Sequence, residues 1–395
     1  MEIKNVVIIN DFDYIQGGAS KVAIQTANIL KEKNPSLNVY FFSGCHKDTS
    51  NLNKDVIAVS LNQKENIKEK NKIKGIINDL YNFKAKKSLK RLLLTLNKDE
   101  TIIHVHGWTK SLSSSVFDVA FKMKFKVILT MHDYFTACPN GGYFNYKKNE
   151  ICDLKPLSIK CIKCNCDSRN YKFKLYRVLR QFIQNKIVKL NNKIEYVISI
   201  SNFSEKILKN TLNNNVKIYR VYNPIDFSKN FSRVNYKNNS YFLYVGRISK
   251  EKGVDIFCEA INLTGLKGIV VGDGSELQRL KEEYKNANID FVGWKSSEEV
   301  KSYMKGAKAL IIPSRWYEVA PLTPLEAMQL GIPVFTSDCN ATIDYIDKTN
   351  GMIFKNVSEL VEIMKSDFNF NVKLDEKYSN DNYYDDLIKV YNEIM

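Results

Sequence analysis

Short apolar runs of strand length alternate with amphipathic stretches along most of the chain. Five runs precede residue 223 and five follow residue 240: 6–9, 39–42, 102–106, 127–131 and 196–200, then 241–245, 268–271, 289–292, 309–312 and 333–336. Such runs are typical of strands buried on both faces, and their alternation with helices predicts parallel, doubly wound α/β sheets. Because the polar stretch 228–240 separates the two series, we predict two Rossmann-like domains. Ligands of such sheets bind beyond the carboxyl ends of the strands.

The chain is expected to divide into three parts. Residues 1–222 would form the first Rossmann-like domain, residues 223–377 the second, and residues 378–395 a terminal helix that covers one sheet face and can pack back on the first domain. The 395 residues leave ample chain for a core in each domain. The longest apolar runs have only strand length, which argues against a spanning helix, and the N-terminus does not resemble a signal peptide. We therefore expect a soluble, cytoplasmic protein.

The net charge of +16 is concentrated in the first half of the chain. Residues 1–240 carry 41 Lys and Arg against 19 Asp and Glu, whereas residues 241–395 carry 18 against 24. The excess comes from two segments: residues 61–98 hold 11 basic and 3 acidic residues, and residues 155–193 hold 11 and 1. A basic half of this kind favours an anionic partner, such as a membrane surface, a nucleic acid or a phosphorylated substrate.

The second half holds the strongest candidate site. Its first strand is followed by a glycine turn and basic side chains, among them Arg247 and Lys252. Cations and free amides at the end of a strand, where a helix begins, can hold a diphosphate. Gly272 ends the next strand, and Trp294 follows the one after it, where its ring could stack on a nucleobase.

Two carboxylates, Glu318 and Glu326, lie eight positions apart in the same half. Thr323 and Pro324 are predicted to be the N-cap and first residue of a helix. Glu326 would then lie in the first helical turn and Glu318 in the loop before it. Both carboxylates could accept hydrogen bonds from sugar hydroxyls in one cleft.

Together these motifs resemble the retaining nucleotide-sugar glycosyltransferases of the GT-B superfamily, family four. The family's Glu-x7-Glu hallmark is matched by Glu318 and Glu326, its second signature by residues 246–253, and its amino-terminal glycine loop by Gly17 and Gly18. The resemblance covers nearly the full length. It implies the GT-B fold, with two Rossmann-like domains facing each other across a cleft, and retention of anomeric configuration without an obligatory metal.

The resemblance also implies a role for each motif residue. Arg247 and Lys252 would hold the donor diphosphate and neutralise the charge on the leaving nucleotide. Glu318 would bind the transferred sugar, and Glu326 the ribose hydroxyls. His132 matches the family's cleft histidine, which touches the donor sugar. The remaining expected donor contacts are Gly17, Gly18, Gly272, Trp294 and Thr323.

The chain departs from the family pattern after the first glutamate. The family usually has a glycine there, but this chain has Val319-Ala320-Pro321, and Pro321 lacks an amide hydrogen. The Thr323 hydroxyl is the expected substitute. Asp11 and Asp13 have the spacing of the metal pair used by the other main class of sugar transferases, yet they lie beside the glycine loop and are not expected to bind a metal.

Five of the eight cysteines fall within 29 residues of the first domain. The Cys161-x-x-Cys164 spacing is that of a metal knuckle, and in a cytosolic protein a cluster of this kind is more often a metal site than a set of disulfides. We expect an insert at about 134–170 with a structural zinc held by Cys138, Cys152, Cys161 and Cys164, and Cys166 as an alternative ligand. Reduced thiols and disulfides are the competing interpretations. Catalysis itself is expected to need no cofactor.

The two basic segments also carry apolar stripes at helical spacing. Leu175, Leu179, Ile183, Ile187 and Leu190 share one stripe of residues 171–190, and a similar set occurs in residues 76–96. One interpretation is a pair of helices docked on the core with solvated basic faces. The other, which we favour, is a peripheral membrane surface that brings the cleft to a lipid-diphosphate acceptor.

From the sequence we expect a glycosyltransferase that moves a sugar from a UDP- or GDP-linked donor to a lipid-linked glycan. Its setting would be capsule, O-antigen or exopolysaccharide synthesis at the inner face of the cytoplasmic membrane. A GT-B relative with different chemistry, such as an epimerase or phosphorylase, is one alternative, against which the Glu-x7-Glu motif argues. A nucleic-acid-binding protein is another, but no RNA-binding signature occurs, so no nucleic-acid partner is expected.

Overall fold

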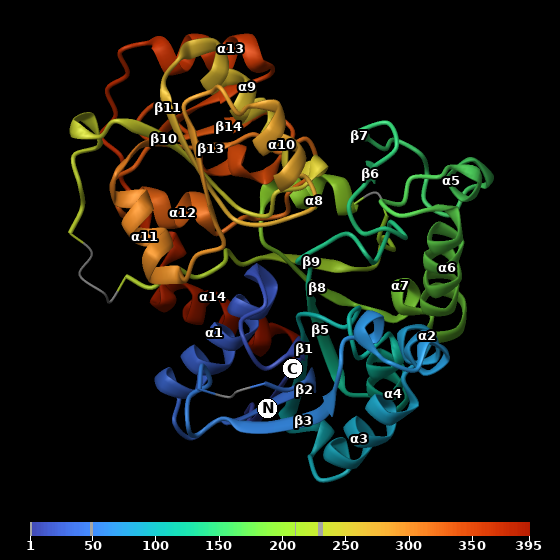
Figure 1. The fold of residues 1–395 in the computed structure, drawn as a ribbon. Helices are drawn as coiled ribbons and strands as arrows, with labels where there is room; N and C mark the ends of the chain where they lie inside the picture. The colour runs from blue at the N-terminus through green and yellow to red at the C-terminus, as the bar shows by residue number, and fades with distance from the viewer. Residues whose placement is uncertain (1, 48–49, 210, 228–231) are drawn as a thin grey trace.

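The computed structural model describes residues 2–47, 50–209, 211–227 and 232–395. In these residues two parallel sheets, of seven and six strands, form two domains with helices on both faces of each sheet (Figure 1). All ten predicted strands are present, with shifted ends. Residues 228–231 of the polar stretch that separates the two series lie outside the described residues. The predicted pair of Rossmann-like domains is confirmed.

The first domain is built on the strand order β3-β2-β1-β4-β5-β8-β9. Its strands are β1 (Asn5–Phe12), β2 (Asn38–Cys45), β3 (Ile57–Gln63), β4 (Thr101–Val105), β5 (Lys126–Thr130), β8 (Tyr196–Ser199) and β9 (Lys217–Arg220). Its helices are α1 (Gly18–Lys33), α2 (Lys72–Leu80), α3 (Phe83–Leu93), α4 (Ser115–Lys122), α5 (Ile159–Lys163), α6 (Tyr171–Phe182), α7 (Leu190–Lys193) and α8 (Asn202–Lys209). A π-helical turn, Ile183–Val188, follows α6, and a small hairpin, β6 (Phe144–Asn145) and β7 (Glu150–Ile151), lies in the cysteine-rich insert.

The second domain has the strand order β12-β11-β10-β13-β14-β15. Its strands are β10 (Tyr241–Val245), β11 (Lys267–Val271), β12 (Ile289–Gly293), β13 (Ala307–Ile312), β14 (Val334–Ser337) and β15 (Gly351–Phe354). Its helices are α9 (Val254–Thr264), α10 (Leu277–Glu283), α11 (Ser297–Lys305), α12 (Thr323–Gln329) and α13 (Val357–Lys365). Among the described residues, no helix combines the length and the apolar character that crossing a bilayer would require.

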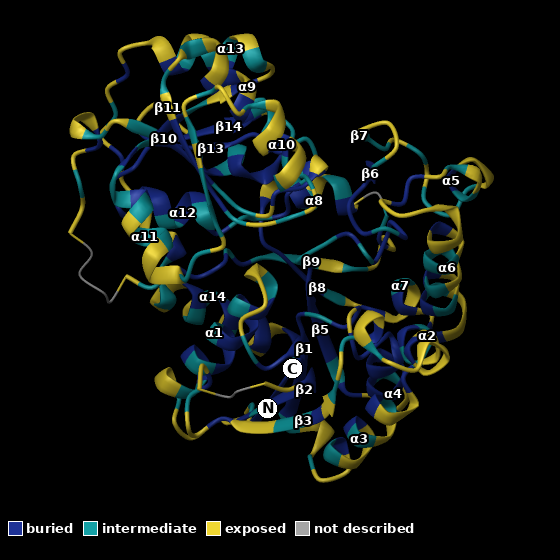
Figure 2. Cartoon of the chain, in the orientation of Figure 1, coloured by how far each residue is buried: buried dark blue, intermediate teal, exposed yellow. Residues whose placement is uncertain are grey.

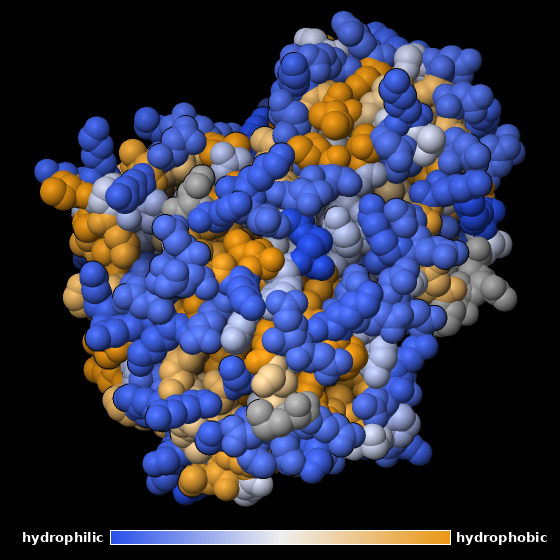
Figure 3. Space-filling model, turned by 180° about the vertical axis from the view of Figure 1, so that it is seen from behind, coloured by the Kyte–Doolittle hydropathy of each residue, from blue (hydrophilic) through white to orange (hydrophobic). Residues whose placement is uncertain are grey.

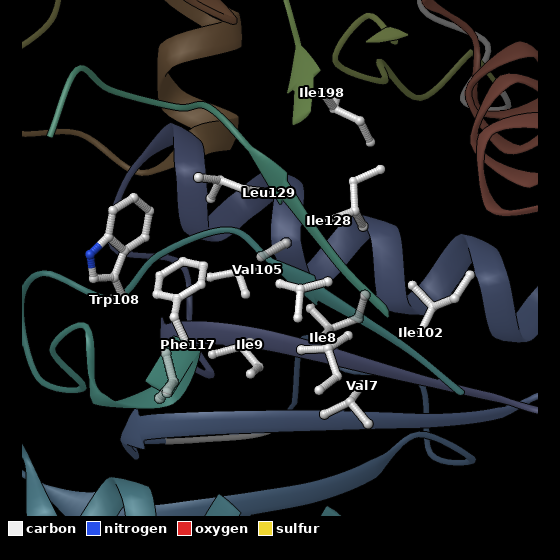
Figure 4. Packing of buried hydrophobic residues seen from close by; sticks show 14 of the residues in the cluster. Val7, Ile8, Ile9, Ile102, Val105, Trp108, Phe117, Ile128, Leu129 and Ile198 are labelled. Carbon is white, nitrogen blue, oxygen red and sulfur yellow. The ribbon is translucent and has the colours of Figure 1, made fainter. Parts of the chain in front are cut away.

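Each sheet is the centre of its own hydrophobic core. Figure 2 shows buried strands within layers of helices whose outer faces are exposed. In the first domain, side chains of adjacent strands meet the helices that cover the sheet, as Figure 4 shows for Ile8 of β1, Ile102 of β4, Ile128 of β5 and Phe117 of α4. This packing holds the carboxyl ends of the strands, and therefore the site loops, in fixed positions.

The last helix, α14 (Asn380–Ile394), packs on the first domain although it follows the second in sequence. Figure 1 shows it beside α1. Tyr391 Oη lies 2.6 Å from His104 Nδ1 of β4, and Tyr383 Oη lies 2.7 Å from Thr26 Oγ1 of α1. These buried hydrogen bonds join the end of the chain to the first domain.

Most of the apolar stripe predicted for residues 171–190 does not dock on the core, although Leu190 at its end is buried there. Leu175, Leu179 and Ile187 are exposed. The interior face instead carries polar side chains, including Lys174 and Gln181, which are buried. The interpretation of this segment as a core-docked helix with a solvated basic face is therefore wrong.

The segment 76–96 is split between two helices. Asn82 begins α3, where its side-chain oxygen accepts a hydrogen bond from Ala85 N over 2.9 Å. Leu89 and Leu93 of α3 are buried in the first core, as a docked helix requires, whereas Ile76 of α2 is exposed. The docked interpretation therefore holds for α3 and not for α2.

Candidate active site

A cavity of about 1110 Å³ lies between the two domains. Its walls come from the loop before α1 and the ends of β5 and β8 on one side, and from the loops after β10, β12 and β13 on the other. Eight of the ten residues predicted for the site line it: Gly17, Gly18, His132, Lys252, Trp294, Glu318, Thr323 and Glu326. The structure thus brings together residues from distant parts of the sequence.

Glu318 lies on the loop after β13, with its carboxylate buried against Lys252. Lys252 Nζ donates to Glu318 Oε1 over 2.5 Å, and Ser314 Oγ donates to the same oxygen over 2.7 Å. Burial by itself raises the pKa of Glu318, but the charge of Lys252 and the hydrogen bonds from Lys252 and Ser314 outweigh it and hold that pKa below its ordinary value. The carboxylate therefore stays ionised and can accept hydrogen bonds from hydroxyl groups.

Glu326 lies in the first turn of α12, as predicted, although the helix starts at Thr323 itself, with Leu322 in the capping position. Its Oε1 atom lies 2.5 Å from Lys21 Nζ of α1, so this ion pair joins the two domains across the cavity. Lys21 was not among the site residues predicted from the sequence. Its position in the first turn after the glycine loop is the one signal that could have indicated it.

Arg247 and Gly272, the other two predicted residues, do not line the cavity. The Arg247 guanidinium is 2.7 Å from Glu251 Oε1, and its side chain is 60% exposed. Gly272 has a φ of 140°, and a Cβ there would lie 1.9 Å from the carbonyl oxygen of Gly246. The close approach of two backbone segments accounts for Gly272, and no ligand is needed to explain it.

Gly17 and Gly18 behave differently from Gly272. A Cβ built on either residue meets no atom within 4 Å, and neither adopts the left-handed backbone region. Packing and backbone strain therefore impose no glycine at these positions. Since both residues line the cavity, close approach of a ligand to their amides is the physical reason that remains.

Trp294 and Thr323 lie on the second domain's side of the cavity. Trp294 follows β12 and is 76% exposed, so its ring has room to meet a planar group such as a nucleobase. Thr323 begins α12, three positions before Glu326. Trp294 and Thr323 therefore line the cavity, and their contacts with a donor stay a prediction.

Three histidines form a buried chain beneath the cavity. His132 lines the cavity, and its Nε2 atom lies 2.9 Å from His106 Nδ1. The rings of His106 and His104 lie 4.2 Å apart, and His104 Nε2 lies 2.7 Å from Thr130 Oγ1. Burial lowers the pKa of His132 and of His104 to about 3 and the pKa of His106 well below its ordinary value. His132 therefore faces the cavity as a neutral imidazole.

These buried histidines make stability depend on pH. Below about pH 6.5 they take up protons in the unfolded chain but not in the folded one, so the free energy of unfolding falls by about 1.4 kcal/mol per pH unit for each histidine. Burial also raises the pKa of Asp133 to about 6, so below that pH the folded chain binds a proton that the unfolded chain does not. This proton offsets the loss of stability caused by one histidine. We expect the urea midpoint to fall between pH 6.5 and 5, and to fall less steeply in His104→Asn. Equal slopes in the two proteins would contradict this assignment.

The loop after Glu318, where the chain departs from the family pattern, is held by the first domain. Ser201 Oγ donates to the carbonyl oxygen of Val319, and Asn223 Nδ2 donates to that of Ala320 over 3.4 Å. The loop therefore rests on Ser201 of the first domain and on Asn223 at the junction of the two domains, and Pro321 is not part of this support.

Asp11 and Asp13 serve the fold of the first domain. The Asp11 carboxylate accepts hydrogen bonds from the backbone amides of Lys110, Ser111 and Leu112, and Asp13 lies 2.7 Å from His46 Nδ1. Both carboxylates are thus engaged by protein donors.

The cysteine-rich insert does not fit the structural zinc predicted from the sequence. Among the described residues, no group of three or more His, Cys, Asp or Glu side chains is placed to hold a metal ion. The buried ammonium of Lys174 instead lies 3.4 Å from Cys161 Sγ and 3.3 Å from Cys166 Sγ, so a protein cation occupies the space beside two candidate ligands. All five sulfurs are present as free thiols: Cys138, Cys152, Cys161, Cys164 and Cys166.

The insert also packs on the second domain, just before Glu318. A Cβ on Gly142 would lie 2.9 Å from the ring of Trp316, and the Tyr134 and Tyr143 rings each lie 6.3 Å from that of Tyr317. Lys252 Nζ lies 5.3 Å from the centre of the Trp316 ring. The insert therefore supports the segment that carries the buried carboxylate, a contact that the sequence alone did not indicate.

Residues 226–380 match the family model described as glycosyl transferases group 1. An uncharacterized 42.6 kDa protein in the cps region of Klebsiella pneumoniae is 23% identical over 349 residues, covering 84% of this chain and 85% of that protein. Solved structures that align with 99% of this chain include the lipopolysaccharide outer core galactosyltransferase WaaB in its apo form, with 16% identity, a TM-score of 0.62 and 100% of that chain covered. Anabaena Alr3699/HepE in complex with UDP and glucose aligns over the same shares of the two chains, with 13% identity and a TM-score of 0.66.

The family match covers the domain that carries Lys252, Glu318 and Glu326, and the structural similarity covers both domains. The chain therefore has the GT-B fold, and its residues 226–380 match the family model of glycosyl transferases group 1.

Proposed function

We propose that this protein is a retaining, metal-independent glycosyltransferase that moves a sugar from a UDP- or GDP-linked donor to a lipid-linked glycan in bacterial polysaccharide synthesis. Its place of action would be the anionic inner face of the cytoplasmic membrane. A relative in a cps region and similarity to a lipopolysaccharide galactosyltransferase support the glycan acceptor. The fold shared with a protein bound to UDP and glucose supports the nucleotide-sugar donor.

The observation that carries this proposal is the arrangement of two carboxylates, each paired with a lysine, around one interdomain cavity. Glu318 is held by Lys252 and Glu326 by Lys21, each over 2.5 Å, and all four residues line the cavity. Carboxylates accept hydrogen bonds from sugar hydroxyls, while lysine cations favour diphosphate oxygens. One cavity thus offers complementary groups for both ends of a nucleotide sugar.

In this proposal Lys252 neutralises the charge that grows on the leaving diphosphate. Arg247 would join it by leaving Glu251, which its exposed side chain allows. Glu326 would bind the ribose hydroxyls, and Glu318 would fix the transferred sugar. The neutral imidazole of His132 would touch that sugar without repelling an oxocarbenium-like state. The acceptor hydroxyl would attack the face from which the nucleotide leaves, which retains the anomeric configuration.

A thermal-shift panel of the purified full chain tests the donor. UDP, GDP, ADP and CMP would each be added with and without a chelator, because a ligand that binds only the folded state raises the melting temperature. We expect one nucleotide family to stabilise the protein, with the same shift when the chelator is present. The anomeric configuration of the product, read by NMR from a donor of known configuration, tests retention.

Each result decides a separate part of the proposal. No shift with any nucleotide would contradict the donor site itself. A shift that disappears with chelator would contradict metal independence, and a product of inverted configuration would contradict retention.

A further inference from the structure

Helix α6 is built with its apolar and polar sides reversed relative to an ordinary surface helix. Leu175, Leu179 and Phe182, spaced to share one face, are 43%, 47% and 50% exposed. The opposite face buries polar groups: Gln181 Nε2 donates to Thr136 O over 3.0 Å, and Lys174 contacts two buried cysteines. The helix is therefore fixed to the domain by polar contacts, and its apolar stripe faces outward.

Helix α2 lies beside α6 and shows the same outward stripe. Ile73, Ile76 and Ile77 are exposed at helical spacing, with Ile73 at 72%. Asp79 joins the two helices, because its Oδ2 atom accepts a hydrogen bond from Tyr176 Oη over 2.7 Å and lies 3.6 Å from Arg180. We call the combined surface of Ile73, Ile76, Ile77, Leu175, Leu179 and Phe182 the α2–α6 ridge.

Basic side chains surround the ridge. Residues 168–194 contain eight Lys and Arg and no Asp or Glu, although Lys174 is buried and Arg177 pairs with Asp167. The Asp79 carboxylate of α2 is engaged between the helices. Exposed lysines flank the apolar stripes, among them Lys72, Lys74 and Lys172. Figure 3 shows hydrophobic groups interleaved with hydrophilic ones along the edge of the molecule where these helices lie in the reversed view. Isolated apolar side chains are common on surfaces, but two aligned stripes within a basic field are not.

We propose that the α2–α6 ridge is the surface by which this protein docks on an anionic lipid bilayer, with its aliphatic side chains inserted between headgroups and its lysines on the phosphates. This inference rests on the proposed function, whose lipid-linked acceptor it would bring to the cavity. An apolar stripe flanked by basic residues is the pattern of helices that lie in the plane of the interface. A second copy of this chain fits poorly, because a symmetric contact would set one basic surface against another.

Flotation of the full chain with vesicles tests the ridge. One set of vesicles is pure phosphatidylcholine and the other contains phosphatidylglycerol, at about 0.1 M salt. We expect binding only to the anionic vesicles. Leu179→Asp/Phe182→Asp should weaken it roughly tenfold or more, and Lys172→Gln about fivefold. Leu263→Asp is the matched control, because Leu263 is a 57% exposed leucine on α9 of the other domain, and this variant should bind like the wild type.

The nucleotide thermal shift, measured on the same variants, separates this inference from the proposed function. Wild-type protein that responds to a nucleotide but ignores anionic vesicles would overturn the ridge and leave the donor site intact. Equal losses in the ridge variant and in Leu263→Asp would also overturn it. So would sedimentation that shows a dimer which Leu179→Asp/Phe182→Asp dissociates, because a second copy would then cover the ridge.

Discussion

Replacing Lys252 with alanine is expected to lower the rate of glycosyl transfer by about two to three orders of magnitude, the usual loss when one group that stabilises a transition-state charge is removed. Lys252 is the cation that lines the cavity and contacts Glu318. The change also leaves the Glu318 carboxylate buried without its partner. Because breaking a buried ion pair costs about 3–5 kcal/mol, urea unfolding should show a clear loss of stability as well.

Two further variants separate these effects. Lys250→Ala removes an exposed lysine from the same turn and should change neither rate nor stability. Lys252→Met/Glu318→Gln removes both charges, so it should recover much of the lost stability while turnover stays low. If the double variant regained activity, Lys252 would act only by neutralising Glu318, and its assignment to the diphosphate would be wrong.

The central strands of both sheets could be predicted from the sequence because burial on two faces forces continuous apolar runs. In the two large sheets the strands that were missed lie at sheet edges: β3, β9 and β15. Each is partly exposed: β9 reads Lys-Ile-Tyr-Arg, and β3 ends in polar residues. An edge strand needs fewer apolar positions, so its pattern does not stand out from a loop.

The site residues could be predicted where a motif of neighbouring residues identifies them. Spacing and turn residues placed Glu318 and Glu326 on one cavity. The pairing of Glu326 with Lys21 depends on how two domains face each other, and no local pattern records that. The stripe of α6 was left open between a docked helix and a membrane surface for the same reason: periodicity identifies an apolar face but not the surface that the face meets.

The predicted zinc ligands are not gathered into one group among the described residues, for a different reason. Cysteine spacing is compatible with several arrangements, and no local pattern indicates that Lys174, eight residues beyond Cys166, is buried among the sulfurs. Lysine is among the residues least often buried, so the Lys174 side chain was expected to be exposed to solvent.

Glu326→Ala should weaken nucleotide binding by about tenfold to a hundredfold, since a hydrogen bond to a charged group contributes about 1.5–3 kcal/mol. The Glu326 carboxylate lines the cavity on the first turn of α12, where it would meet the ribose hydroxyls. Isothermal titration with the nucleotide that gives the largest thermal shift measures the loss. Turnover at saturating donor should fall much less than in Lys252→Ala, because ribose contacts are similar in the ground and transition states.

Stability provides the check on this assignment. The Lys21–Glu326 pair is partly exposed on both sides, so its loss should cost at most about 1 kcal/mol of folding free energy, and a tenfold loss of affinity could not arise from unfolding. Glu283→Ala removes an exposed carboxylate, paired with Arg279, from the same domain and serves as the matched control. If Glu326→Ala bound the nucleotide like Glu283→Ala, then Glu326 would be a residue that joins the domains through Lys21, and the ribose would have to be held elsewhere in the cavity.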